Sequence, residues 1–392
     1  MTSTPTIPLD PILRALKDSP LFQLSLASKE LFHSNFLAWL CETYPNAAGH
    51  LFARFLKQPP LTYEHLKVDR ERNKIDLWLE YSGGEALIIE NKVKSLPTLA
   101  QLQEYTAKIQ NKAQTSFLLL SLTRPTFLPL HETTIPISDG VVWHSLTYRE
   151  LASKLRDLLP DITAVNSYHG QLLRDYTDFI TQLDALQTRF IINWDDDNSN
   201  FFGGQQDIQR LRSIRLHDVI DKMRYAQLAQ QITAVLRTDG FRTDNQNFWR
   251  GQVGQVFVDH GMTRGTGLFD FKYCLMNKDR FGTPVILGIQ IQGADFRLVV
   301  EVGDRIRAPK IAAALRQPKD GNQVWFNFGL LPSGSEERPK KHAFNQYSGQ
   351  FLYRWKRIES IAPQHLVDII VAYAHLIRAN ETILCQQIEA IP

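Results

Sequence analysis

One stretch, residues 74–105, constrains the fold of this chain more than any other. It contains two short apolar runs, IDLWLEY and EALIIENKV, which are joined by Ser82-Gly83-Gly84. Strand-forming runs on either side of a glycine turn predict a β-hairpin. The second run includes the continuous apolar stretch ALII, which is typical of a strand buried on both faces. We therefore expect the hairpin to lie in a sheet with helices on its faces.

Three charged residues mark one end of this hairpin. Asp76 begins the first run, and Glu90 and Lys92 end the second. Residues two apart in a strand point to the same face, so Glu90 and Lys92 share a side. A hairpin folded at Gly83-Gly84 brings Asp76 back beside the end of the second strand. We therefore predict that two carboxylates and one ammonium group converge at one end of the sheet.

This set of groups suits a divalent cation. Two carboxylates and a main-chain carbonyl, here that of Asn91, make a hard oxygen site for Mg²⁺ or Mn²⁺. Such an ion lowers the pKa of a bound water and neutralises charge on a phosphate. Lys92 can orient the water or stabilise the developing negative charge. The alternative is a plain ion pair between Glu90 and Lys92, because pairing also offsets the desolvation of buried charges.

The wider pattern resembles a known family. Asp76 and Glu90-Asn91-Lys92 resemble the D…(D/E)xK signature of the PD-(D/E)xK nuclease superfamily. Residues 30–40 (ELFHSNFLAWL) and 101–105 (QLQEY) resemble flanking motifs of a bacterial branch of that superfamily. The resemblance covers about residues 20–125. It implies a restriction-endonuclease-like fold and a metal-dependent nuclease.

The resemblance also implies roles for residues outside the hairpin. Glu30, on an N-terminal helix, would add an acidic group at the metal, and Gln101 and Tyr105 would support the substrate or Lys92. The implied metal ligands are thus Asp76, Glu90, Asn91 and Glu30, and the implied catalytic residues are Asp76, Glu90, Lys92, Gln101 and Tyr105. The alternative for Glu30 is a favourable charge at a helix N-terminus. For Gln101 and Tyr105, it is an ordinary place on the helix surface.

Three further residues near these motifs need an interpretation. Ile75 stands where the motif name has proline, and Asp69 is a second acidic candidate. His33 would lie one turn from Glu30 on the same helix, where we expect a hydrogen bond at the helix start rather than catalysis.

Hydrophobic periodicity predicts the order of elements in the first half of the chain. A helix at residues 30–44 is followed by three strands, a helix at residues 98–110 and a strand at residues 116–122. The first of the three strands is expected at residues 61–68, before the hairpin. This order is the αβββαβ core of the superfamily, so both approaches predict an α/β fold. A further strand and amphipathic helices follow, at residues 141–146, 147–159 and 164–186.

The length of 392 residues predicts two domains. Residues 191–204 (IINWDDDNSNFFGG) form the expected linker, between a nuclease-like domain at residues 1–190 and a second domain at residues 205–392. The acidic run at residues 195–197 is interpreted as solvated linker rather than as a metal site.

The second domain is predicted to be α+β, with an antiparallel sheet, and to recognise substrate or partner. Strands are expected at residues 254–258, 267–276, 284–292, 296–302, 323–330 and 351–357, and helices at 205–237, 310–315 and 363–379. Trp325, Phe328 and Trp355 are expected in the core, although aromatic and basic side chains together can also stack bases and hold phosphates. Residues 248–250, 305–310 and 338–342 carry cations that are candidates for nucleic-acid contact.

Composition and cysteine usage limit the remaining choices. The net charge of +3 is compatible with nucleic-acid binding but does not argue for it. Three distant cysteines suit a reducing cytosol and give no zinc spacing. The N-terminus lacks a basic-then-apolar signal, and no apolar run approaches the roughly 20 residues that span a bilayer. We expect a soluble, cytoplasmic protein without a membrane partner.

The resulting functional hypothesis is a Mg²⁺- or Mn²⁺-dependent nuclease that hydrolyses phosphodiester bonds. DNA is the favoured substrate, an endonuclease in phage defence or DNA processing is the expected role, and a homodimer is possible because enzymes that cut both strands often pair. An RNase with the same residues is one alternative. The other is a non-catalytic protein that binds nucleic acid or a partner on a nuclease-like scaffold.

Overall fold

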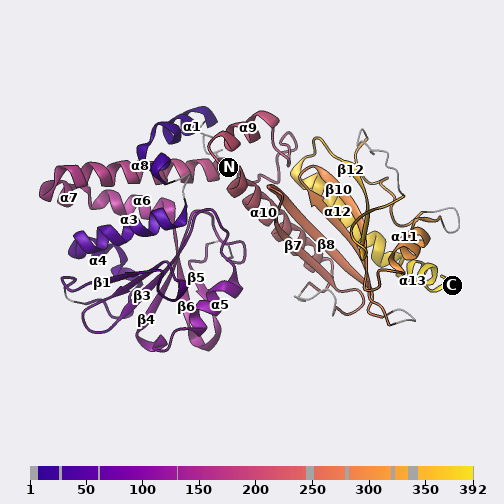
Figure 1. The fold of residues 1–392 in the computed structure, drawn as a ribbon, viewed down its shortest axis with the longest axis horizontal. Helices are drawn as coiled ribbons and strands as arrows, with labels where there is room; N and C mark the ends of the chain where they lie inside the picture. Colours follow the sequence, from indigo (N-terminus) through magenta and orange to yellow (C-terminus); the bar gives the residue numbers. More distant parts are fainter. Residues whose placement is uncertain are drawn as a thin grey trace. The chain divides into compact units, whose positions relative to one another are not determined.

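The chain folds into two compact units in a computed structural model. One unit comprises Met1–Ile191 and Gln209–Met223, and the other comprises Ile192–Ile208 and Arg224–Pro392. Figure 1 shows a β-sheet with helices in each unit. The structure describes residues 8–25, 29–60, 62–129, 131–243, 251–278, 282–318, 323–333 and 343–391.

The first unit is built on a six-stranded sheet with the order β1-β2-β3-β4-β6-β5. Strands β1, β2 and β3 are antiparallel neighbours, whereas β3, β4 and β6 run parallel, and β5 pairs antiparallel with β6. The strands are β1 (Lys67–Arg70), β2 (Leu77–Glu80), β3 (Ala86–Lys92), β4 (Thr115–Ser121), β5 (Thr134–Pro136) and β6 (Val142–Thr147).

The predicted hairpin is confirmed as the β2–β3 pair. Gly83 and Gly84 have φ angles of 104° and 86°, a left-handed conformation that glycine adopts without a Cβ clash. The register pairs Leu77 with Ile89. All seven residues of β3 are buried, as expected for a strand that is covered on both faces.

Helices cover both faces of this sheet, which confirms the predicted α/β fold. Leu87 and Ile89 of β3 face a core shared with α1, α3, α4, α6 and α8, whereas Ile88 faces a smaller core shared with α5. Figure 1 shows α3, α6 and α8 on one side of the strands and α5 on the other. These helices are α1 (Leu9–Asp18), α2 (Pro20–Leu24), α3 (Glu30–Thr43), α4 (Pro45–Phe52), α5 (Leu99–Ala107), α6 (Tyr148–Asp157), α7 (Leu159–Val165) and α8 (Ser167–Arg189).

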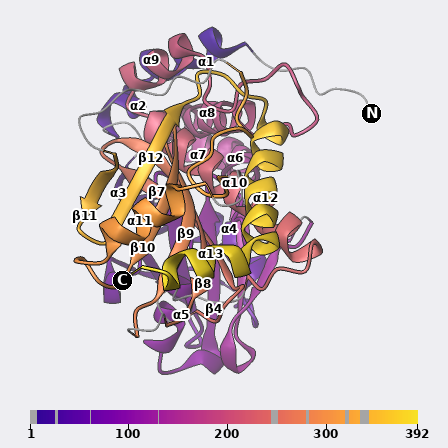
Figure 2. The same cartoon turned by 90° about the vertical axis from the view of Figure 1, so that its right-hand side faces the viewer.

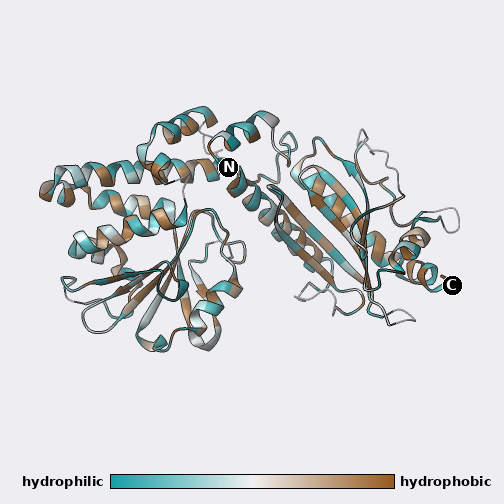
Figure 3. Ribbon diagram, viewed as in Figure 1, coloured by the Kyte–Doolittle hydropathy of each residue, from teal (hydrophilic) through white to brown (hydrophobic). Residues whose placement is uncertain are grey.

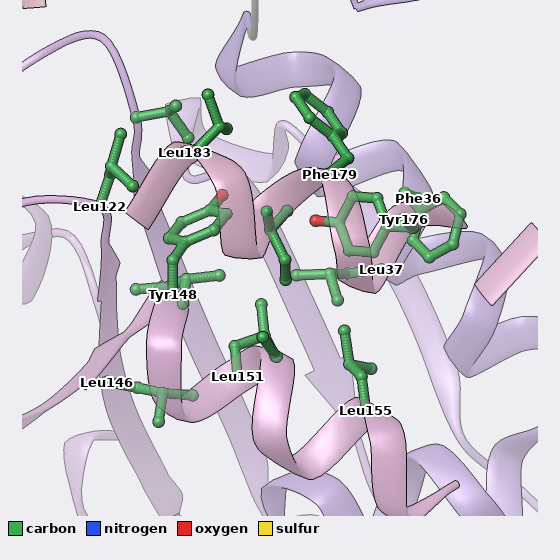
Figure 4. Packing of buried hydrophobic residues seen from close by; sticks show 14 of the residues in the cluster. Phe36, Leu37, Leu122, Leu146, Tyr148, Leu151, Leu155, Tyr176, Phe179 and Leu183 are labelled. Carbon is green, nitrogen blue, oxygen red and sulfur yellow. The ribbon is translucent and has the colours of Figure 1, made fainter. Parts of the chain in front are cut away.

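The larger of the two cores is rich in aromatic rings. Phe36 of α3 stacks on Tyr176 of α8, with ring centroids 3.8 Å apart. In Figure 4, Tyr148 and Leu151 of α6 point toward the same group of side chains. Close packing of α3, α6 and α8 fixes the end of β3 from one side, because residues of all three helices share one continuous core with β3.

The second unit contains an antiparallel sheet with the order β11-β12-β10-β9-β8-β7. Its helices pack their apolar sides into one core with this sheet, and Figure 2 shows α12 and α13 beside the strands. The strands are β7 (Val256–Thr263), β8 (Thr266–Met276), β9 (Val285–Gln292), β10 (Asp295–Val302), β11 (Asn345–Ser348) and β12 (Phe351–Arg357). The helices after β7 are α11 (Ala308–Arg316), α12 (Pro363–Ala379) and α13 (Glu381–Glu389).

Hydropathy follows the expected periods in both units. Figure 3 shows hydrophobic residues along the strands, and helices with one hydrophobic and one hydrophilic side. Among the described helices, none combines the length and the apolar character needed to cross a membrane.

Two predicted strands are wrong in whole or in part. Strand β1 begins at Lys67, so residues 62–66 of the predicted strand are not part of it, and residue 61 lies outside the described residues. In this stretch the ring of Tyr63 packs against Gly49 of α4 instead. Residues 323–330 form no strand. The indole of Trp325 instead donates to the carbonyl of Val299 at 3.2 Å, and Phe326 has a φ of 59°. Because these aromatic residues are buried, their spacing in the sequence resembles that of a core strand.

The division between the units differs from the predicted linker at residues 191–204. Phe201 is 1% exposed and belongs to the core of the second unit. Helix α9 (Gln205–Ser213) and the beginning of α10 (His217–Thr238) contribute to the core of the first unit. Helix α10 then continues into the core of the second unit, where Leu228 and Ile232 are buried.

Candidate active site

The predicted carboxylates lie together where β2 begins and β3 ends. The pairing of Leu77 with Ile89, extended by one residue, places Asp76 opposite Glu90. The backbone N–H of Asn91 donates to Asp76 Oδ2 at 2.8 Å, which holds the Asp76 carboxylate beside β3. The first prediction, that the hairpin brings Asp76 back to the end of the second strand, therefore agrees with the structure.

Glu90 and Lys92 form a buried ion pair on one face of β3. Lys92 Nζ lies 2.6 Å from Glu90 Oε1, and the two side chains are 9% and 2% exposed. Both point to the face that α5 covers, in line with Ile88. A charged pair at this depth is unusual, because removing two charges from water is costly unless their surroundings compensate.

Helix α5 adds two of the predicted residues to this face. Thr98 caps the helix, since its hydroxyl accepts from the backbone N–H of Gln101 at 3.3 Å. Gln101 Nε2 in turn donates to Glu90 Oε1 at 3.4 Å and to the Tyr105 hydroxyl at 2.8 Å. The spacing of four residues thus places both side chains on the helix face that meets Glu90.

The side chain of Asn91 points to the opposite face and is anchored there. Its amide donates to Ser34 Oγ at 3.1 Å and to the carbonyl of Glu30 at 3.2 Å, and its Oδ1 accepts from the Tyr148 hydroxyl at 2.7 Å. The N–H and C=O groups of one strand residue point the same way, so the Asn91 carbonyl is directed toward the Asp76 side. These contacts of Ser34 and Tyr148 were not predicted from the sequence.

Glu30 is placed differently from the predicted metal ligand. Its Oε1 accepts from the backbone N–H groups of Val93, Lys94 and Ser95 at 3.2, 3.2 and 2.9 Å, and from Ser95 Oγ at 2.5 Å. This oxygen therefore anchors the loop that follows β3. The structure gives Glu30 a supporting position next to the site rather than a free carboxylate oxygen at Oε1.

Burial and mutual repulsion govern the two carboxylates at the end of β3. Burial, together with the neighbouring Asp76, raises the pKa of Glu90 to about 7, although Lys92 opposes the shift. Burial also raises the pKa of Asp76, and the Asn91 N–H and Lys92 act in the opposite direction. Two carboxylates that repel each other in a poorly solvated place favour a cation between them.

The pKa values of two neighbouring side chains, Lys92 and Tyr105, are raised as well. Burial lowers the pKa of Lys92, but the Glu90 carboxylate more than offsets this, so the pKa of Lys92 is raised and its ammonium form is favoured. Burial and the negative charge of Glu90 raise the pKa of Tyr105, which keeps its hydroxyl protonated.

The donor set fits a hard divalent cation. Glu90 Oε2 is buried and accepts no hydrogen bond from the residues that the structure describes, so a ligand position is left over. Asp76 and the Asn91 carbonyl supply further oxygens on that side. No group of three or more His, Cys, Asp and Glu side chains in the described part of the chain is arranged to hold a metal ion. The candidate site thus depends on two carboxylates and one carbonyl.

Two other candidates have structural roles. Asp69 pairs with Lys67 and Arg72 at 3.2 and 3.1 Å on the partly exposed strand β1. His33 is fully buried, and its Nδ1 lies 3.1 Å from the Tyr176 hydroxyl. Burial lowers the pKa of His33 to about 3, so it is a neutral core residue.

The aromatic and cationic candidates in the second unit differ in how far they are buried. Trp325 and Phe328 are buried as expected, at 0% and 7% exposed, whereas Trp355 is half-buried on β12. Arg305 and Lys310 are exposed. The predicted cationic residues at 248–250 and 338–342 lie outside the described residues.

Comparison with known protein families agrees with this geometry. Residues 20–178, which include all six strands of the first sheet and helices α3 and α5, match the family model described as the PD-(D/E)XK nuclease superfamily. Over these residues the chain is similar to the PD-(D/E)XK nuclease superfamily. Comparisons with curated proteins and with solved structures found no match.

Proposed function

We propose that the first unit is a Mg²⁺- or Mn²⁺-dependent nuclease that hydrolyses phosphodiester bonds, with DNA as its favoured substrate. One observation carries the proposal: Glu90 lies opposite Asp76 at a strand end, with Lys92 Nζ 2.6 Å from its carboxylate. The match of residues 20–178 to a nuclease superfamily supports the same chemistry.

Each residue has a role that follows from its contacts. Asp76, Glu90 Oε2 and the Asn91 carbonyl would hold the cation, which would activate a water and neutralise charge on the scissile phosphate. Lys92 carries its proton and would orient the attacking water or stabilise the charge that develops on the phosphate. Gln101 donates to Glu90 and Tyr105, so these two α5 residues would fix the carboxylate and meet the substrate.

The proposed biological role is phage defence or DNA processing. Cleavage of foreign DNA in phage defence, or processing of the host's own DNA, would use the same site. One chain carries one such site among its described residues, so cutting both strands at one place would call for two copies. Light scattering in the presence of duplex DNA would report a homodimer.

Cleavage assays test the proposal. The protein is incubated with supercoiled plasmid, linear duplex, single-stranded DNA and RNA, each with Mg²⁺, Mn²⁺ or a chelator. We expect cleavage of DNA that requires the cation and is lost in Glu90→Gln. Cation-dependent cleavage of RNA alone would change the substrate to RNA. Unchanged cleavage in Glu90→Gln would overturn the site.

A non-catalytic binding protein is the second candidate function. The absence of a three-residue His, Cys, Asp and Glu cluster among the described residues favours it, because such a cluster would give tighter metal binding. Calorimetry distinguishes the two functions. A Mn²⁺ signal that disappears in both Asp76→Asn and Glu90→Gln supports the enzyme. A protein that binds DNA but gives no such signal supports the binding role.

A further inference from the structure

The loop that follows β3 is held by more contacts than an ordinary connection. This loop, residues 93–95, begins directly after Lys92, and its three backbone N–H groups donate to Glu30 Oε1 from α3. Loops commonly leave backbone groups to water. Here the contacts restrain the segment that leads away from the proposed catalytic strand.

Lys94, in the middle of this loop, is bonded through every polar group it has. Its N–H donates to Glu30, and its carbonyl accepts from Lys222 Nζ at 2.8 Å. Its own Nζ donates to the carbonyl of Arg215 at 2.8 Å and lies 3.5 Å from Asp218 Oδ1. Three of these partners come from the turn between α9 and α10 and from the first turns of α10.

The partner segment, Gln209–Met223, is itself fixed within the first unit. It contributes several buried side chains to the large core: Leu211, Ile214, Leu216, Val219, Ile220 and Met223. The N–H of Leu216 donates to the carbonyl of Leu211 at 3.1 Å, a bond that closes the end of α9. A rigid segment therefore contacts the loop, so the contacts of Lys94 can fix the position of the loop.

Arg215 adopts a backbone conformation that serves the contact with Lys94. Its φ of 57° is left-handed, which an arginine adopts at a cost of about 1 kcal/mol and which usually falls to glycine. The carbonyl of this residue is the one that accepts from Lys94 Nζ. The strained turn thus presents an acceptor to the loop after β3.

We propose that Lys94 is a positioning residue, through which the segment Gln209–Met223 fixes the loop after β3 and so the placement of Lys92. The inference rests on the proposed nuclease function for its effect on rate. One residue, Val93, separates Lys92 from Lys94, so the loop cannot shift without moving the strand end. A displacement of about 1 Å in a catalytic group lowers a rate by up to about 100-fold.

Kinetics of two variants test this role. Lys94→Met removes the bonds to Arg215 and Asp218, and Lys222→Met removes the bond to the Lys94 carbonyl together with a 3.9 Å ion pair to Asp218. For both, we expect kcat to fall about tenfold, with KM for DNA within about twofold. Lys94→Arg should recover part of kcat. A raised KM with unchanged kcat in Lys94→Met would overturn the proposal and make Lys94 a phosphate contact.

Two controls separate the contact from general effects of charge. Lys67→Met removes a lysine of β1 that pairs with Asp69 and Glu80 and does not contact the loop after β3. In this variant kcat should stay unchanged. Arg215→Gly keeps the carbonyl and suits the left-handed φ, so kcat should again be unchanged. A tenfold loss of kcat in Lys67→Met would overturn the specific role of Lys94.

Hydrogen exchange makes the proposal independent of catalysis. In the full chain, amides of residues 93–95 should exchange at least about tenfold faster in Lys94→Met and Lys222→Met than in the unaltered protein. Unchanged exchange in both variants would overturn the proposal, even if the protein cleaves DNA. Faster exchange in a protein that cleaves nothing would uphold the loop contact while the nuclease function fails.

Discussion

Two buried lysine–glutamate pairs, one in each unit, have the same length and different surroundings. Lys92 Nζ lies 2.6 Å from Glu90 Oε1 in the first unit, and Lys272 Nζ lies 2.6 Å from Glu301 Oε1 in the second. Both glutamates are almost fully buried, at 2% and 5% exposed, and burial raises the pKa of each. Burial and pairing therefore do not by themselves mark a catalytic site.

The difference lies in what surrounds each pair. Glu90 is at a strand end beside Asp76, and its Oε2 has no hydrogen-bond donor among the described residues. Glu301 also lies near a strand end, in β10, but neither of its oxygens is both fully buried and without a hydrogen-bond partner. The second pair also has a nearby carboxylate, Asp270, but that group accepts from Gln290 at 2.9 Å. A fully buried carboxylate oxygen without a donor is what distinguishes the proposed active site.

The largest expected effect concerns cleavage. Lys92→Ala removes the ammonium group beside Glu90, so we expect the rate of phosphodiester hydrolysis to fall by about 10²–10⁴-fold. Lys272→Ala is the matched control and should leave the rate per folded molecule within about twofold. Initial rates on plasmid DNA with Mg²⁺, alongside circular dichroism, measure both. Equal losses in the two variants would contradict the distinction between the pairs.

The second prediction concerns stability and alters the pair of Lys272 and Glu301 in the second unit. Lys272→Met leaves the Glu301 carboxylate buried without its cation, which should destabilise the second unit by about 3 kcal/mol. Adding Glu301→Gln should recover part of this loss, because the unpaired charge is gone. Urea unfolding monitored by fluorescence gives both values. A single variant as stable as the unaltered protein would mean that the second pair is solvated.

The buried imidazole of His33 gives a third prediction. Burial lowers the pKa of His33 from 6.5 to about 3 in the folded chain, so protonation favours unfolding. Its stabilising contribution is complete above pH 6.5 and is lost as the pH falls toward 3. At pH 5 the loss should be about 2 kcal/mol. His33→Gln, which cannot titrate, should flatten the fall in stability between pH 6.5 and 5, and an unchanged slope would contradict this.

The smallest expected effect is a gain in stability. Asp76→Asn removes the charge that repels Glu90 but keeps an oxygen for the Asn91 N–H, so the protein without cation should gain about 1 kcal/mol at pH 8. The same variant should lose its calorimetric Mn²⁺ signal. Thermal unfolding in chelator measures the gain. A loss of stability would mean that Asp76 is a structural carboxylate.

Local patterns were sufficient to predict the centre of the first unit. The glycines of the hairpin, the apolar run before Glu90 and the spacing of Gln101 and Tyr105 all act over a few residues, and the structure agrees with each. Contacts between distant segments were not predictable in this way. Tyr148 reaches Asn91 across 57 residues, and Lys94 meets Arg215 across 121. Such contacts depend on how helices pack, which periodicity does not reveal.

The chain returns to the first unit after entering the second, and this has a consequence for any attempt to separate the two. A fragment that ends at residue 190 would lack the core side chains of Gln209–Met223 and would leave an apolar stripe exposed to solvent. Neither half can be transplanted or swapped with another protein by a single cut. Recombination that preserves both halves has to respect α10, whose two ends are committed to different hydrophobic cores.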